Sequence, residues 1–179
     1  MKRILIAGML LVSLTGCGAF KNPREGSIVP ISSSNYHLIN GKYTARTDTS
    51  TSSNDFNLWS CLSRQPMEKT LLLKDLSIDL KMMNKKRLKA TLFSGGIEIE
   101  QRIFKGKLRK GYFRLSDKTN LTGIPPIYWA VFSEKTRIGK SAKGTLILEN
   151  VSSRGGMFLF FAASSPDHYL TIDFNPIKE

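Results

Sequence analysis

One stretch decides the fold class: Leu76-Ser77-Ile78-Asp79-Leu80-Lys81-Met82, then the polar turn Asn84-Lys85-Lys86, then Leu88-Lys89-Ala90-Thr91-Leu92. In both runs apolar residues alternate with polar ones, which places the apolar side chains on one face of a sheet. Two such runs around a polar turn are typical of an antiparallel hairpin with one buried face. The stretch therefore predicts two paired strands that cover a core.

The same pattern continues along the chain. A first short run lies at 41–45, and further β-prone runs follow at 97–103, 112–115, 127–132, 145–148, 157–163 and 169–174. Gly, Pro or polar turns separate them. The stretch 119–126 is expected to be a loop, and 137–143 is a basic, Gly-bearing stretch between two of the runs. This spacing favours an all-β fold, an antiparallel up-and-down barrel or a sandwich of about eight or nine strands.

Helices have little place in this pattern. A parallel sheet would need crossover helices, and no long amphipathic helix is visible after residue 70. Phe56, Trp59 and Leu62 share one helical face before Pro66, which ends the segment. We therefore expect at most one short helix, near residues 55–65.

The N-terminus has the layout of an export signal. Lys2 and Arg3 precede an apolar stretch, 4–14, that is too short to span a bilayer as a stable helix. The segment ends Leu14-Thr15-Gly16-Cys17 and resembles the lipobox of bacterial lipoproteins. The resemblance implies that residues 1–16 are a cleaved signal peptide and that Cys17 carries the lipid, with palmitate or a similar acyl chain on its new amine. An ordinary signal with an incidental Cys is the alternative.

The lipoprotein resemblance also implies an address. In the enteric sorting scheme an Asp after the lipidated Cys retains the protein in the inner membrane, and here Gly18 follows Cys17. This implies export and anchorage to the cell envelope, at the outer membrane and facing the periplasm. Residues 17–40 are then the lipidated Cys and a flexible tether, and 41–179 form a single β domain. The resemblance does not choose between barrel and sandwich.

Once Cys17 is lipidated, Cys61 is the remaining thiol and no internal disulfide can form. Its neighbours Leu58, Trp59 and Leu62 favour a small buried hydrophobic residue. An intermolecular disulfide and a reactive thiol stay open as alternatives.

The start of the first expected strand, Gly41-Lys42-Tyr43, loosely resembles that of lipocalin-like bacterial lipoproteins. That resemblance implies an apolar or amphipathic small ligand inside a barrel. Without such a ligand, the aromatic side chains are expected to fill the core. They are Trp59, Tyr128, Trp129, Phe132, Phe158, Phe160, Phe161 and Phe174.

The formal net charge of +13 favours anionic partners. Basic residues gather at 81–89, 102–114 and 135–143, and the export signal argues against nucleic acid as the partner. If the hairpins stack in one sheet, an anionic envelope component could bind a positive face, for which the candidate residues are Lys85, Lys86, Arg87, Arg109 and Lys110. The alternative is a solubilising surface with edge-strand protection by Lys.

Motifs for catalysis or metal binding are missing. Asp167-His168 lacks a Gly-x-Ser-x-Gly elbow, His37 is the only other histidine, and Cys-x-x-Cys and calcium-loop patterns are absent. Glu98 and Glu100 alternate with Ile97 and Ile99, which predicts a solvated face of glutamates. We expect no catalytic residue, no metal and no cofactor.

These features predict a membrane-anchored envelope lipoprotein with a non-catalytic, β-rich binding domain for an anionic envelope component or an amphipathic small ligand. The alternative is a structural or assembly subunit of an envelope protein complex. A hydrolase on a β scaffold is a third reading, and the oligomeric state stays open.

Overall fold

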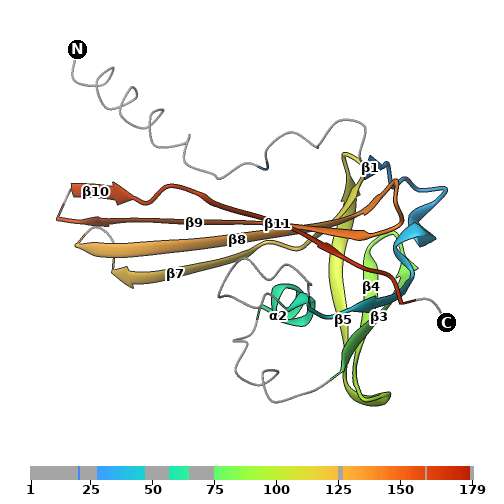
Figure 1. The fold of residues 1–179 in the computed structure, drawn as a ribbon. Coiled ribbons are helices and arrows are strands. Elements are labelled where there is room, and N and C mark those ends of the chain that lie inside the picture. Colours follow the sequence, from blue (N-terminus) through green and yellow to red (C-terminus); the bar gives the residue numbers. More distant parts are fainter. Residues whose placement is uncertain are drawn as a thin grey trace.

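Two long neighbouring strands, β8 (Tyr128–Ser141) and β9 (Leu146–Phe158), run through the whole length of the computed structural model (Figure 1). The structure describes residues 20, 28–46, 57–64, 75–124, 127–159 and 161–177. The predicted signal peptide, 1–16, and Cys17 lie outside the described residues.

The described chain is mostly antiparallel β-sheet, with one short α-helix, so the predicted all-β class is confirmed. The remaining elements are β1 (Ile28–Val29), the 3-10 helix η1 (Tyr36–Ile39), β2 (Gly41–Thr44), α2 (Leu58–Ser63), β3 (Leu76–Asn84), β4 (Arg87–Ser94), β5 (Ile97–Arg109), β6 (Tyr112–Leu115), β7 (Lys118–Ile124), β10 (Phe161–Ser164) and β11 (His168–Phe174). The predicted hairpin is β3–β4, and α2 lies inside the range predicted for a helix.

The sheet has the order β10-β9-β8-β6-β5-β4-β3-β2 and turns a corner within β5. Residues 97–105 of β5 pair with β4, whereas 106–109 pair with β6. Gly106 stands at the change of partner, where a Cβ atom would lie 2.5 Å from the carbonyl oxygen of Arg114. A side chain is excluded there, so the corner depends on this glycine.

The two halves of the bent sheet enclose the core, and we call this part the body. Its largest fully buried side chains include Tyr43, Phe113, Phe174 and Ile78. After β11 the chain runs beside β2, where the amide of Ile177 donates to the carbonyl of Lys42 (2.8 Å). The sheet is curled around its core and is not closed.

Beyond the body, the outer halves of β8 and β9 continue as a four-stranded sheet that we call the arm. It consists of 118–124 (β7), 128–134 of β8, 152–158 of β9 and 161–164 (β10). Figure 1 shows the arm projecting to the left, with β7 and β10 on its two outer sides. All residues of β7 and β10 are exposed.

The structure corrects the sequence interpretation in three places. The described residues form eleven strands rather than the eight or nine that were expected. The expected loop at 119–126 holds β7, where a Cβ atom on Gly123 would clash with the carbonyl oxygen of Tyr128, so this glycine serves close strand packing. The expected single strand at 157–163 is instead a hairpin, since β9 ends at Phe158 and β10 begins at Phe161.

Residues 28–40, which were expected to belong to a flexible tether, are ordered in the structure. Ile28 pairs with Ser141 of β8, and Ile31 and Ile39 are buried in the core. Residues 28–40 are therefore part of the folded body. The free energy gained by removing the isoleucine side chains from water exceeds what the polar residues around them would gain by staying flexible in water.

Candidate functional site

The predicted basic candidates lie on one exposed side of β5. The turn that holds Lys85 and Lys86 is joined to β5 by a hydrogen bond from the amide of Gly106 to the carbonyl of Lys86 (2.9 Å). Arg109 and Lys110 begin the next turn, roughly 10 Å further along the strand. We call the exposed set the basic ridge: Lys85, Lys86, Arg87, Lys105, Lys107, Arg109 and Lys110.

The third basic group of the sequence does not join this ridge. Arg137 is buried and forms an ion pair with Glu149. Lys140 donates from Nζ to the hydroxyl of Tyr43 (2.7 Å), and burial lowers the pKa of its ammonium group. These two cations stabilise the body from within and are not part of an anion-binding surface.

The predicted solvated face of glutamates on β5 is present at Glu98, which is exposed, and in part at Glu100, which is half-buried. Ile97 and Ile99 are 70% and 47% exposed, while Glu100 forms an ion pair with Arg102. The reason is α2, whose Trp59 packs edge-on against Phe104 with 6.3 Å between ring centroids. That contact turns the even-numbered residues of β5 towards the helix and the isoleucines outward.

The two histidines lie far apart in sequence and in different elements. His37 is in η1, with 3.8 Å between the centres of its ring and the tilted ring of Tyr36, and His168 begins β11. The carboxylate of Asp167 accepts a hydrogen bond from the hydroxyl of Tyr169 (3.2 Å). Within the described chain, no group of three His, Cys, Asp or Glu side chains is placed to hold a metal ion.

Cys61 lies in α2 as a free thiol packed against the core. Burial, and to a lesser degree the negative charge of Glu134, raises the pKa of its thiol to about 12. A thiol must be deprotonated to react, so this environment favours the predicted packing role.

The aromatic residues do not all fill the core, as the sequence had suggested. Trp59 and Phe174 do, but Tyr128, Phe158 and Phe161 are 47%, 61% and 80% exposed. Phe160 lies outside the described residues. β-Propensity predicts a strand without showing whether that strand stays inside the body.

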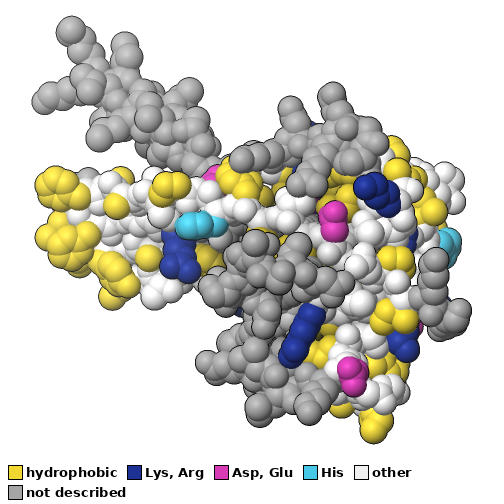
Figure 2. Space-filling model, in the orientation of Figure 1, with side chains coloured by type: hydrophobic (Ala, Val, Ile, Leu, Met, Phe, Trp, Pro, Cys, Tyr) yellow, Lys and Arg dark blue, Asp and Glu magenta, His cyan; other side chains and the backbone are white. Residues whose placement is uncertain are grey.

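These exposed side chains gather at the end of the arm. Register aligns Ile124, Tyr128, Phe158 and Phe161 in one row across the four strands. The neighbouring Ile127 and Leu159 are exposed as well. We call these six residues the tip; Figure 2 shows hydrophobic side chains concentrated at this end. Exposed apolar clusters of this kind are typical of interaction sites.

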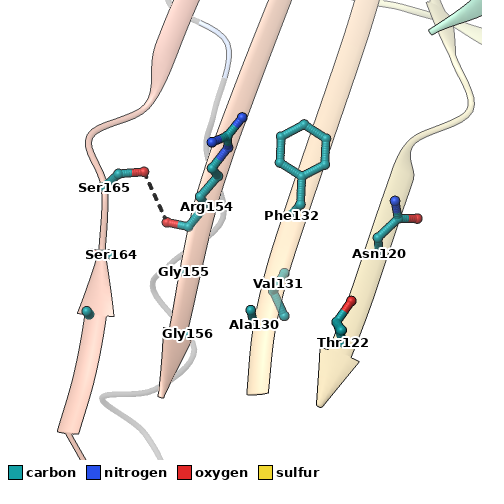
Figure 3. A pocket seen from close by; sticks show the side chains of 11 residues that line it. Asn120, Thr122, Ala130, Val131, Phe132, Arg154, Gly155, Gly156, Ser164 and Ser165 are labelled. Atoms are coloured by element: carbon teal, nitrogen blue, oxygen red, sulfur yellow. Dashed lines mark hydrogen bonds between the residues drawn. The ribbon is translucent and has the colours of Figure 1, made fainter. Parts of the chain in front are cut away.

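The two faces of the arm differ in chemistry. One face has a shallow groove of about 810 Å³ near Asn120, Thr122 and Arg154. Figure 3 shows Asn120, Phe132 and Arg154 on three adjacent strands of the groove. The guanidinium carbon of Arg154 lies 5.4 Å from the centre of the Phe132 ring.

We call the opposite face of the arm the smooth face. In the described arm, this face has no charged residue from the row of paired residues that contains Thr119 up to the tip. Because side chains alternate along each strand, it is formed by the odd-numbered positions of β7, β8 and β9. Its larger members are Leu121, Trp129, Val131 and Met157.

Charge is distributed unevenly between arm and body. Residues 119–133 and 155–166 contain no Asp, Glu, Lys or Arg, although such residues make up 23% of the chain. Between the Lys118–Glu134 pair at its base and the tip, Arg154 is the one charged residue of the described arm. Most of the net positive charge of the described residues therefore lies in the body.

No protein-family model, curated protein or solved structure is significantly similar to this chain. Among the described residues, no helix is long and apolar enough to cross a membrane.

Proposed function

We propose that this chain is a lipid-anchored envelope protein that acts as an assembly subunit, with the arm as its docking element. The arm carries the proposal because it is a single-layer sheet with an apolar tip and no exposed charge on its smooth face. A folded sheet normally buries at least one face against a second layer. Among the described residues no second layer covers the arm, so a partner that supplies this layer is the expected ligand of the arm.

The size of the tip supports this reading. Four large apolar side chains stand in one row, and Phe161 is 80% exposed. Burying a side chain of this kind is worth about 1.5–3 kcal/mol. A partner that covers the row would therefore gain several kcal/mol before the costs of association.

The anchor proposed for Cys17 would hold the arm near the membrane. The ring of Phe20 lies 4.3 Å from the guanidinium carbon of Arg137, in β8 next to the base of the arm. Cys17 precedes Phe20 by three residues, so their Cα atoms are at most about 11 Å apart. A lipid on Cys17 would therefore enter the membrane close to that base.

Binding of an anionic envelope component to the basic ridge is a second candidate function. The observation that favours it is the hydrogen bond that brings the Lys86 turn beside β5. A basic residue near an anionic membrane surface contributes about 1 kcal/mol. Replacement of Lys86 and Arg109 by Gln should then weaken binding to anionic vesicles at low salt, whereas unchanged binding would exclude the ridge.

The arm is tested by the size of the complex extracted from membranes in mild detergent. We expect the wild-type lipoprotein to run well above a monomer on a native gel. The double variant Phe158→Ser/Phe161→Ser should run as a monomer. Ile97→Ser/Ile99→Ser is the matched control, since these side chains are similarly exposed on β5, and it should keep the complex. A monomeric wild type, or a tip variant that keeps the complex, would contradict the proposal.

A further inference from the structure

We infer that the arms of several copies of this chain pair edge to edge and form one β-barrel that crosses the membrane, so that the assembly is a pore. This inference rests on the proposed function and identifies the partner as further copies of the chain.

The first observation concerns the two outer edges of the arm. In the described part of the chain, β7 pairs with β8 alone and β10 with β9 alone, so each leaves an outer edge without a strand partner. β7 runs from the base towards the tip and β10 runs back from the tip. The β10 edge of one copy and the β7 edge of the next are therefore antiparallel, and an even number of strands per copy lets the pattern close.

The second observation concerns the difference between the smooth face and the groove face of the arm. A membrane barrel alternates lipid-facing apolar residues with residues that line its interior. Trp129, Val131 and Met157 would face lipid, and the groove with Asn120 and Arg154 would line the interior. The opposite arrangement would place the Arg154 charge in the hydrocarbon, at a cost of about 2–4 kcal/mol per copy near the membrane centre.

Lipid also explains why the edges must pair. An unpaired backbone amide or carbonyl in hydrocarbon costs several kcal/mol, so an isolated four-stranded arm cannot enter a bilayer. Pairing with other copies satisfies both edges at once. An apolar arm with free edges thus fits a closed ring of arms better than it fits insertion as a monomer.

The length of the arm sets how the bilayer must fit around it. From Tyr128 to Glu134, the part of β8 that belongs to the arm, the strand measures about 20 Å. A strand tilt of about 40° leaves roughly 15 Å of height, to which the tip turns add, against an apolar band of about 25 Å in outer-membrane barrels. The bilayer would therefore be thinned around the barrel. By alternation, Tyr128, Phe158 and Phe161 share the face of the groove, so they would surround the far mouth of the interior.

Disulfide formation between copies tests the edges. Full-length lipoprotein with Cys61→Ala would carry Ala163→Cys on β10 together with Asn120→Cys, Thr122→Cys or Ile124→Cys on β7. Within one copy, position 163 is three strand spacings from position 122, about 14 Å, which is too far for a disulfide. Oxidation in membranes should give a ladder of covalent oligomers for at least one pair.

Leu121→Cys with Ala163→Cys is the matched control, because position 121 points to the smooth face. It should give no ladder. The inference would be overturned if no pair gave a ladder and each complex held one copy of the chain. The proposed function would then remain in place. A monomeric wild type would overturn both.

Crossing of the membrane is tested by conductance and by labelling. Wild-type lipoprotein in planar bilayers should form discrete channels that prefer anions, because each copy would add one Arg154 to the interior. Arg154→Gln should weaken that preference. With Cys61→Ala, Ile127→Cys should react with a membrane-impermeant maleimide added on the side opposite the body. Oligomers that neither conduct nor label from that side would overturn the pore.

Discussion

Arg137 and Glu149 face each other across β8 and β9 at the base of the arm and form a buried ion pair. The Nε of Arg137 donates to Oε2 of Glu149 (2.7 Å), and the hydroxyl of Tyr112 donates to Oε1 (2.8 Å). The guanidinium carbon also lies 4.1 Å from the Tyr112 ring. Three strands, β6, β8 and β9, are thereby fixed in register where the body ends and the arm begins.

Removal of one partner from this pair should be strongly destabilising. Glu149→Gln leaves the Arg137 charge buried without a counter-charge, which costs about 3–5 kcal/mol in the free energy of unfolding. Urea unfolding followed by circular dichroism measures it. Asp117→Asn is the control, since its partner Arg114 sits in a more exposed ion pair whose loss should cost less than about 1 kcal/mol. Equal losses for the two variants would contradict a special role for the buried pair.

Gly106 offers a second test, of the corner in β5. Gly106→Val would drive its side chain into the carbonyl oxygen of Arg114 and the ring of Phe113. Overpacking of this kind typically costs 1–3 kcal/mol or more, so we expect a melting temperature lower by about 5 °C or more. Gly144→Val tests a glycine with open space around it but with a φ of +86°, so it should show backbone strain alone. A melting temperature for Gly106→Val no lower than for Gly144→Val would refute the steric argument.

The β3–β4 hairpin was predictable because alternation in one stretch specifies both the strands and their buried face. Leu80 and Leu88, which the pattern turned inward, are fully buried. The arm was not predictable in this way. Alternation shows which side chains share a face, as Trp129 and Val131 do, but not whether a second layer covers that face. Gly123 was interpreted as a loop residue, since a sequence does not separate a glycine required by close packing from one required by a turn.

The isoleucines of β5 show the same limit on a smaller scale. Alternation predicted a solvated face of glutamates, but it did not predict that Ile97 and Ile99 are exposed as well. The Trp59–Phe104 contact decides the orientation of the strand. That contact joins α2 to β5 across a long sequence separation, and no local pattern encodes it. The basic ridge was predictable only as a set of residues, because its assembly depends on the position of Gly106 beside Lys86.

Cys61 predicts a pH dependence of stability. Its thiol has a pKa of about 12 in the folded chain against an ordinary value of 9.0. Between these values the unfolded chain loses a proton that the folded chain keeps, so the free energy of unfolding falls as pH rises, by up to about 1.4 kcal/mol per pH unit. Below pH 9 the contribution is fully present. Both proteins in the comparison carry Cys17→Ser, so that Cys61 is the single thiol of the reference protein. Between pH 8 and 10.5, the urea midpoint should fall less steeply when Cys61→Ala is added. Parallel curves would contradict the shift.

The two cysteines also provide the test of the anchor. If Cys17 is lipidated, Cys17→Ser should move the protein from the membrane fraction to the soluble fraction, because the acyl chains supply the lasting part of the membrane affinity. Cys61→Ser removes the other thiol and should leave the protein in the membrane fraction. The measurement is fractionation after a high-salt wash, which releases proteins held by charge alone. Tight membrane association of Cys17→Ser after that wash has two explanations: the anchor is not on Cys17, or the arm also holds the protein in the membrane. Adding Phe158→Ser/Phe161→Ser to Cys17→Ser distinguishes them, because membrane association of this combined variant would refute the lipoprotein assignment. Loss of membrane association only in the combined variant would assign the anchorage to the arm.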